Sequence, residues 1–80
     1  MVKLMGHFSV RVMNSDEDPA GDIGVMIDYG MLNGTDERRT NREGWVEFHN
    51  HGDKPGDIWV HGHNMGSHSL ADRKTYSFTI

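Results

Sequence analysis

Residues 40–64, TNREGWVEFHNHGDKPGDIWVHGHN, decide the fold because they contain two short apolar alternations around a polar loop. In residues 45–49, Val46 and Phe48 alternate with other side chains, and in residues 57–62 Ile58 and Val60 do the same. Such alternation indicates strands with one buried face. Glycine and proline in residues 51–56 indicate a loop between them. The stretch therefore predicts two strands joined by a short connection.

The same alternation recurs on both sides of this stretch. It predicts further strands at residues 7–13, 23–31 and 74–80, and the polar residues 35–40 are expected as the return strand of a hairpin. Residues 14–22 form a turn-rich acidic segment, and Asn33-Gly34 is a strong hairpin signal. A short helical turn competes with a strand at residues 35–40. Residues 64–72 are the least readable segment, with Leu70 as the one strong core candidate.

Six or seven short strands without helical periodicity predict an all-β protein. We expect a single domain, residues 1–80, folded as a seven-stranded antiparallel Greek-key sandwich of the Ig-like or prealbumin-like kind. The predicted core consists of the inward positions of the strands: Phe8, Val10, Val12, Val25, Ile27, Val46, Phe48, Ile58, Val60, Leu70, Phe78 and Ile80.

Composition narrows the classes of partner. The 80 residues contain 8 basic and 12 acidic side chains, for a formal charge of −4, and no cysteine. Disulfides and thiolate metal sites are therefore absent. No basic stripe with interleaved aromatic residues occurs, so we expect no nucleic-acid partner. No apolar run approaches the roughly 18 residues that a membrane span needs, so we expect no membrane partner.

Three segments together resemble a known family. Pro19-Ala20-Gly21 precedes the alternation of Val25 and Ile27, TNREGWVEF follows at residues 40–48, and GDIWV at residues 56–60. This order resembles the carboxypeptidase regulatory-like domains, which share it with Cna-B repeats and the wider transthyretin-like group. The resemblance implies a seven-stranded Greek-key sandwich that serves as an accessory, adhesive or stalk-like module.

Two activities of that wider group do not transfer to this chain. The isopeptide bond of some Cna-B repeats needs a lysine on the first strand and an asparagine on the last, but residues 7–13 contain no lysine and residues 74–80 contain no asparagine. The hydroxyisourate hydrolase branch ends in Tyr-Arg-Gly-Ser, where this chain has YSFTI at residues 76–80.

The outward positions of the opening stretch carry the candidate site. If residues 45–49 and 57–62 pair as a hairpin, one outer face combines both tryptophans with three histidines and a glutamate. The candidate binding residues are Trp45, Glu47, His49, Trp59, His61 and His63. Exposed tryptophan is typical of interfaces. The alternative is that one indole covers the edge of the small core and the other packs on it.

The histidines also suggest a metal site. His49 and His51 are two residues apart, as are His61 and His63, so on strands each pair would share a face. Imidazole groups with a carboxylate suit Zn²⁺, Cu²⁺ or Ni²⁺. The alternative is a set of solvated histidines on an exposed sheet face. The acidic residues of 16–22 lack the spacing of an EF-hand calcium loop, and a solvated loop is the simpler interpretation.

No catalytic motif is present. The chain lacks a Gly-x-Ser-x-Gly elbow, and His68 between Ser67 and Ser69 does not form a nucleophile–base pair by sequence adjacency. The letters of His49-Asn50-His51 match a nuclease motif that requires a helix, which is not predicted here. We therefore predict a non-catalytic binding or assembly module that contacts a protein partner, a second copy of itself or a carbohydrate. A histidine-based metal-binding protein is the alternative.

Overall fold

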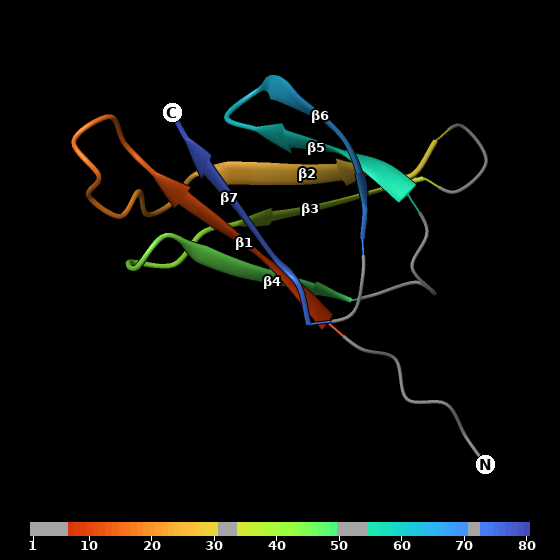
Figure 1. The fold of residues 1–80 in the computed structure, drawn as a ribbon, viewed down its shortest axis with the longest axis horizontal. Helices are drawn as coiled ribbons and strands as arrows, with labels where there is room; N and C mark the ends of the chain where they lie inside the picture. Colours follow the sequence, from red (N-terminus) through yellow and green to blue (C-terminus); the bar gives the residue numbers. More distant parts are fainter. Residues whose placement is uncertain (1–6, 31–33, 50–54, 71–72) are drawn as a thin grey trace, which may run out of the picture.

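The computed structural model describes residues 7–30, 34–49, 55–70 and 73–80. In these residues the structure is all-β (Figure 1). The strands follow one another as β1 (His7–Met13), β2 (Gly24–Asp28), β3 (Thr35–Arg39), β4 (Trp45–His49), β5 (Pro55–Val60), β6 (His63–Ser69) and β7 (Thr75–Thr79). Strands are therefore confirmed at every place where the alternation predicted one, with ends that differ by up to three residues.

The strands form two packed sheets. One sheet has the order β4-β1-β7 and the other the order β3-β2-β5-β6. The chain changes sheets between β1 and β2, β3 and β4, β4 and β5, and β6 and β7. As a result, β4 and β5 do not pair with each other. Each lies beside a strand that is distant in the sequence.

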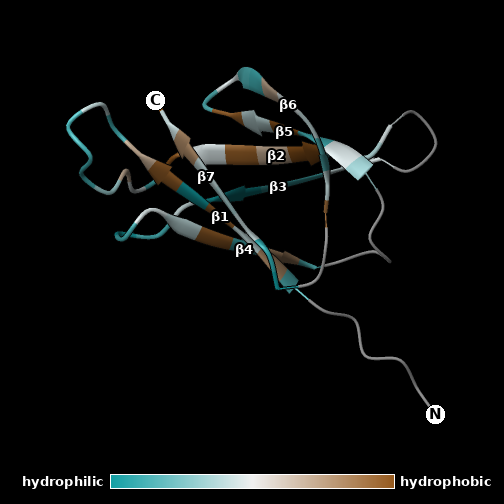
Figure 2. Cartoon of the chain, in the orientation of Figure 1, coloured by the Kyte–Doolittle hydropathy of each residue, from teal (hydrophilic) through white to brown (hydrophobic). Residues whose placement is uncertain are grey.

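The inward side chains of both sheets form one apolar core. Ten predicted core residues are buried: Phe8, Val10, Val12, Val25, Ile27, Val46, Phe48, Ile58, Val60 and Leu70. Figure 2 shows brown, apolar segments alternating with paler or teal ones along several strands, β1 among them. Phe78 is only partly buried against this core. Ile80 was predicted wrongly, since it lies beyond the end of β7 and is 38% exposed.

The prediction of a fully antiparallel sandwich is wrong for one pair. β1 and β7 run parallel, with Ser9 beside Thr75 and Met13 beside Thr79. A parallel pair needs a long crossover connection, which the rest of the chain supplies here. The first strand also pairs with β4 rather than with β2. This order differs from the immunoglobulin order, in which the first two strands share a sheet.

β6 is a strand that the sequence did not predict. It follows β5 through a two-residue turn in which His61 and Gly62 both have positive φ, 52° and 81°. Positive φ at both positions is the requirement of a type I′ hairpin turn. The predicted strand at residues 57–62 therefore ends at Val60. β2 and β3 pair as the predicted hairpin, whereas Asn33 lies outside the described residues.

Candidate functional site

The predicted outer face that combines both tryptophans does not exist as one surface. Trp45 and Glu47 lie on β4, in the three-stranded sheet, and Trp59 lies on β5, in the four-stranded sheet. Their side chains point outward from opposite sides of the sandwich, because the inward positions of both strands are buried. The hairpin assumption was wrong, since alternation identifies the buried face of a strand but not its partner.

The predicted histidine pairs are also separated. His49 ends β4, while His63 begins β6 in the other sheet. His61 is a turn residue, so it does not share a strand face with His63. His51 lies outside the described residues. The described part of the chain contains no group of three or more His, Cys, Asp or Glu side chains arranged to hold a metal ion.

The outer surface of the three-stranded sheet, here called the Trp45 face, gathers polar and aromatic side chains in rows. Its members are the outward residues of β1, β4 and β7: His7, Ser9, Arg11, Met13, Trp45, Glu47, His49, Thr75, Ser77 and Thr79. The amide of Val12 donates to the Gly44 carbonyl, so these two residues are a hydrogen-bonded pair of β1 and β4. Such pairs alternate with closely spaced pairs that share no hydrogen bond. The latter are Arg11 with Trp45, Ser9 with Glu47 and His7 with His49. Cross-strand side chains on this face are therefore near neighbours.

Arg11 and Trp45 form the central pair of the Trp45 face. They are register partners, and the guanidinium carbon lies 5.2 Å from the centre of the indole ring. This distance is within the range of a cation–π contact. Both residues are partly buried, and Arg11 Nε is shielded from solvent without a hydrogen-bond partner in the described structure. The cation–π contact thus holds the Arg11 guanidinium against the indole at the centre of this face.

His7 and His49 form the pair at one end of the Trp45 face. They are register partners on β1 and β4, and their ring centres lie 4.8 Å apart at a tilt of 42°. Both side chains are exposed. Glu47 occupies the adjacent row on the same strand. The structure thus brings His49 together with a histidine that was not among the predicted ligands.

The outer surface of the four-stranded sheet has a different composition. Trp59 is flanked by Met26 on β2 and by Asn64 on β6, with Glu37 beyond Met26. Trp59 is partly buried, and its indole nitrogen is shielded without a hydrogen-bond partner among the described residues. This tryptophan packs into its surroundings and shares no row with a histidine.

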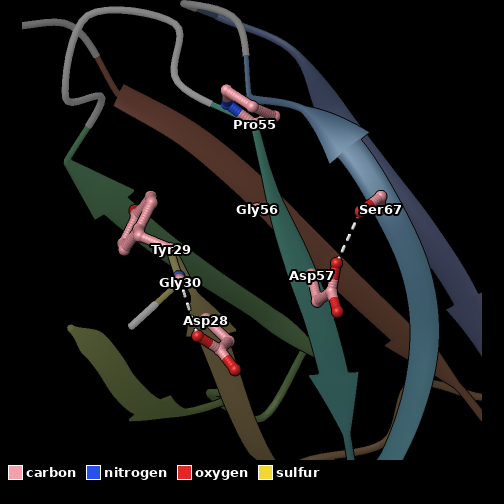
Figure 3. Close-up of a pocket in the computed structure, with 7 residues that line it drawn as sticks. All are labelled: Asp28, Tyr29, Gly30, Pro55, Gly56, Asp57 and Ser67. Atoms are coloured by element: carbon pink, nitrogen blue, oxygen red, sulfur yellow. Dashed lines mark hydrogen bonds between the residues drawn. The ribbon is translucent and has the colours of Figure 1, made fainter. Parts of the chain in front are cut away.

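Near one end of the four-stranded sheet lies an open depression of about 240 Å³ (Figure 3). Asp28 and Asp57, which are register partners, both line it. Asp57 accepts hydrogen bonds from Ser67 Oγ (2.5 Å) and from Asn64 Nδ2 (3.2 Å). These bonds, that of Ser67 first, lower the pKa of the Asp57 carboxyl. Asp28 accepts a bond from the Gly30 amide. Both carboxylates are thus engaged by the protein's own donors.

Sequence analysis missed several of these neighbours. With Val10 and Val12 predicted in the core, Arg11 falls on the polar side of its strand, but nothing in the sequence sets it beside Trp45, 34 positions later. The same holds for His7 with His49 and for Asp28 with Asp57. In each case the alternation gives the correct face, but the partner follows from strand order, which the sequence pattern does not contain.

No model of a known protein family matches the chain, and no curated protein matches it significantly. The described residues include no helix with the length and hydropathy of a membrane span.

Proposed function

We propose that this protein is a non-catalytic binding module that contacts a protein partner through the Trp45 face. The observation that carries the proposal is the Arg11–Trp45 pair at the centre of this face. Arginine and tryptophan are the residue types most enriched at interface hot spots, especially when held rigidly and surrounded by polar groups. The polar groups around this pair are Glu47, His49 and the hydroxyl groups of β7. Trp59 lies outside this proposed surface.

We further propose that the sandwich is of the transthyretin-like, Greek-key kind found in carboxypeptidase regulatory-like domains. Two features support this. Gly44 ends the turn before β4, and GDIWV lies within β5. The length and the seven strands also agree with it. An accessory or adhesive role follows from the resemblance and is compatible with a binding face.

Site-specific photo-crosslinking in the source cells tests the proposed face. A photoreactive residue replaces Glu47, and in a matched variant it replaces Glu37, an exposed glutamate on the outer face of the other sheet. We expect a discrete protein adduct from position 47 that disappears with Trp45→Ala and persists with Trp59→Ala. Equal adducts from positions 47 and 37, or none from position 47, would contradict the proposal. The latter result would favour a carbohydrate on the indole.

A second candidate function is transition-metal binding by His7 and His49, with Glu47 close by. The 4.8 Å separation of the two imidazole rings favours it. A cross-strand histidine pair can supply two nitrogen ligands to Zn²⁺, Cu²⁺ or Ni²⁺, with water completing the coordination. Neutral imidazole is the ligand, so protons compete with the metal for both rings.

Metal titration followed by NMR of the histidine rings tests this candidate. We expect Zn²⁺ to shift the His7 and His49 signals together, and His7→Ala or His49→Ala to remove the effect on the other ring. His63→Ala, on the opposite sheet, is the control and should leave the titration unchanged. If the His7→Ala variant still binds the metal with wild-type affinity, the pair is not the site.

A further inference from the structure

β7 leaves one side of its main chain unpaired within the described structure. It pairs with β1 and with no other described strand. The Ser9 amide donates to the Lys74 carbonyl, and the Ile80 amide donates to the Met13 carbonyl. In a parallel pair, alternate residues point their amide and carbonyl groups toward the same neighbour. The groups of Thr75, Ser77 and Thr79 therefore point away from β1. We call this side the β7 edge.

The other three edge strands carry features that discourage pairing with another chain. β3 has four consecutive charged residues and is hydrophilic along its length in Figure 2. On β4, the amide and carbonyl of Trp45, which face away from β1, are both bonded by Asn41, and Glu47 adds a charge. β6 contains a register irregularity against β5 and a glycine with positive φ, Gly66.

β7 has none of these features. Its sequence, TYSFT, contains no charge, no proline and no glycine, and its pairing with β1 is regular. Its outward side chains are exposed, and the aromatic ones are partly buried. Ile80, the large apolar residue at its end, is also exposed. An uncharged, regular edge of β-branched and aromatic residues is a template for strand addition.

The TYSFT sequence also indicates what pairs with it. Read in either direction, it runs Thr, aromatic, Ser, aromatic, Thr. If two copies pair antiparallel with Ser77 facing Ser77, then Thr75 faces Thr79 and Tyr76 faces Phe78 of the other copy. Thr–Thr and aromatic–aromatic pairs are favourable across strands. In this register, the residues that exchange both main-chain hydrogen bonds are Thr75, Ser77 and Thr79. Their amide and carbonyl groups are the ones that face the β7 edge.

We propose that the protein forms a two-fold dimer through antiparallel pairing of β7 with β7 of a second copy. The two three-stranded sheets then become one continuous sheet with the order β4-β1-β7-β7-β1-β4. An isologous contact of this kind closes on itself and generates no filament. The dimer also places two Trp45 faces on one side of one sheet, which would increase the avidity for a repeated partner.

Sedimentation across a concentration series tests the dimer. We expect the wild type to dimerise reversibly and Ser77→Lys to raise the dissociation constant by about tenfold or more, because two like charges then face each other at the axis. Thr35→Lys, an exposed threonine on the β3 edge, is the matched control and should dimerise normally. A wild type that stays monomeric, or a Ser77→Lys variant that dimerises as tightly as wild type, overturns the proposal.

A pair of double variants tests the register independently. With Thr75→Lys and Thr79→Asp together, each lysine faces an aspartate of the other copy, and dimerisation should persist. With Thr75→Lys and Thr79→Lys together, like charges face each other and dimerisation should be lost. Equal behaviour of the two double variants contradicts the antiparallel register. Circular dichroism of each monomer establishes that the substitutions, all at exposed outward positions, leave the fold intact.

Discussion

At the scale of single residues, Thr40 joins the two connections that lead from one sheet to the other, β1 to β2 and β3 to β4. It is the one buried polar residue among the described side chains, 5% exposed. Its Oγ1 donates to the Ala20 carbonyl (2.7 Å) and accepts from the Ile23 amide (2.9 Å). Its own amide donates to the Ile23 carbonyl. Thr40 therefore fixes the chain that enters β2 against the chain that leaves β3 for the other sheet.

Replacing Thr40 by valine keeps the shape but removes the hydroxyl. The Ile23 amide and the Ala20 carbonyl each then lose a bond in a poorly solvated place. We expect the free energy of unfolding to fall by about 1–3 kcal/mol, measured by urea denaturation. Thr35→Val, at an exposed position of β3, should change stability far less. Equal effects of the two substitutions would show that the Thr40 hydroxyl has no special role.

Asp57 predicts a pH dependence. Its folded pKa lies below the ordinary value of 3.8 because Ser67 and Asn64 donate to the carboxylate. A lowered folded pKa means that the carboxylate stabilises the fold above pH 3.8, and that this contribution is lost as the pH falls through the folded pKa. Ser67→Ala should raise the pKa of Asp57, measured by carboxyl NMR, and make the acid-side loss of thermal stability shallower. An unchanged pKa would contradict this.

At the scale of elements, alternation predicted the buried face of each strand correctly but not its neighbours. Val46 and Phe48 face the core as expected, yet β4 pairs with β1 rather than with β5. The glycine and proline of residues 51–56 predict a loop, but they do not distinguish a hairpin from a passage between sheets. For this reason the fold class could be predicted, whereas the surface that combines Trp45 with Trp59 was an error.

β6 shows the other limit of sequence patterns. Its residues, HNMGSHS, contain no apolar alternation. At an inward position β6 has His68, whose ring contacts the rings of Tyr76 and Phe78 rather than the aliphatic core. The register irregularity against β5 and Gly66 interrupt the period further. The signal that could have identified β6 was the His61-Gly62 turn, since glycine at the second position suits a type I′ hairpin.

Two glycines with the same backbone conformation should respond differently to alanine. Gly44 (φ 78°) and Gly62 (φ 81°) both lie in the left-handed region. A Cβ on Gly44 would stand 2.3 Å from the Val12 carbonyl oxygen, while nothing lies within 4 Å at Gly62. We expect Gly62→Ala to cost about 1–2 kcal/mol from φ alone, and Gly44→Ala about 1–3 kcal/mol more from backbone displacement.

Thermal or urea unfolding of the two alanine variants gives the comparison. The difference between their free energies of unfolding measures the effect of the close contact between the Gly44 turn and β1, because the strain from positive φ is the same in both variants. If both variants lose the same stability, the turn before β4 does not pack against β1 as the structure has it, and the register of β4 would need revision.

At the scale of the whole molecule, the order of the strands distributes the chemistry between two outer surfaces. The Trp45 face receives Arg11, Glu47 and the His7–His49 pair, whereas Trp59 lies opposite with Asp28 and Asp57. Both the proposed partner site and the proposed dimer use the three-stranded sheet. They depend on β4 and β7 flanking β1, so the topology is the central claim of the account.

Inter-strand NOEs in the NMR spectrum test this claim most directly. Antiparallel pairs without mutual hydrogen bonds bring their Hα atoms closest. The account predicts Hα–Hα NOEs between Ser9 and Glu47 and between Arg11 and Trp45 in one sheet, and between Ile27 and Ile58 in the other. NOEs between β4 and β5, which a Trp45–Trp59 hairpin would give, together with loss of those between β1 and β4, would contradict it.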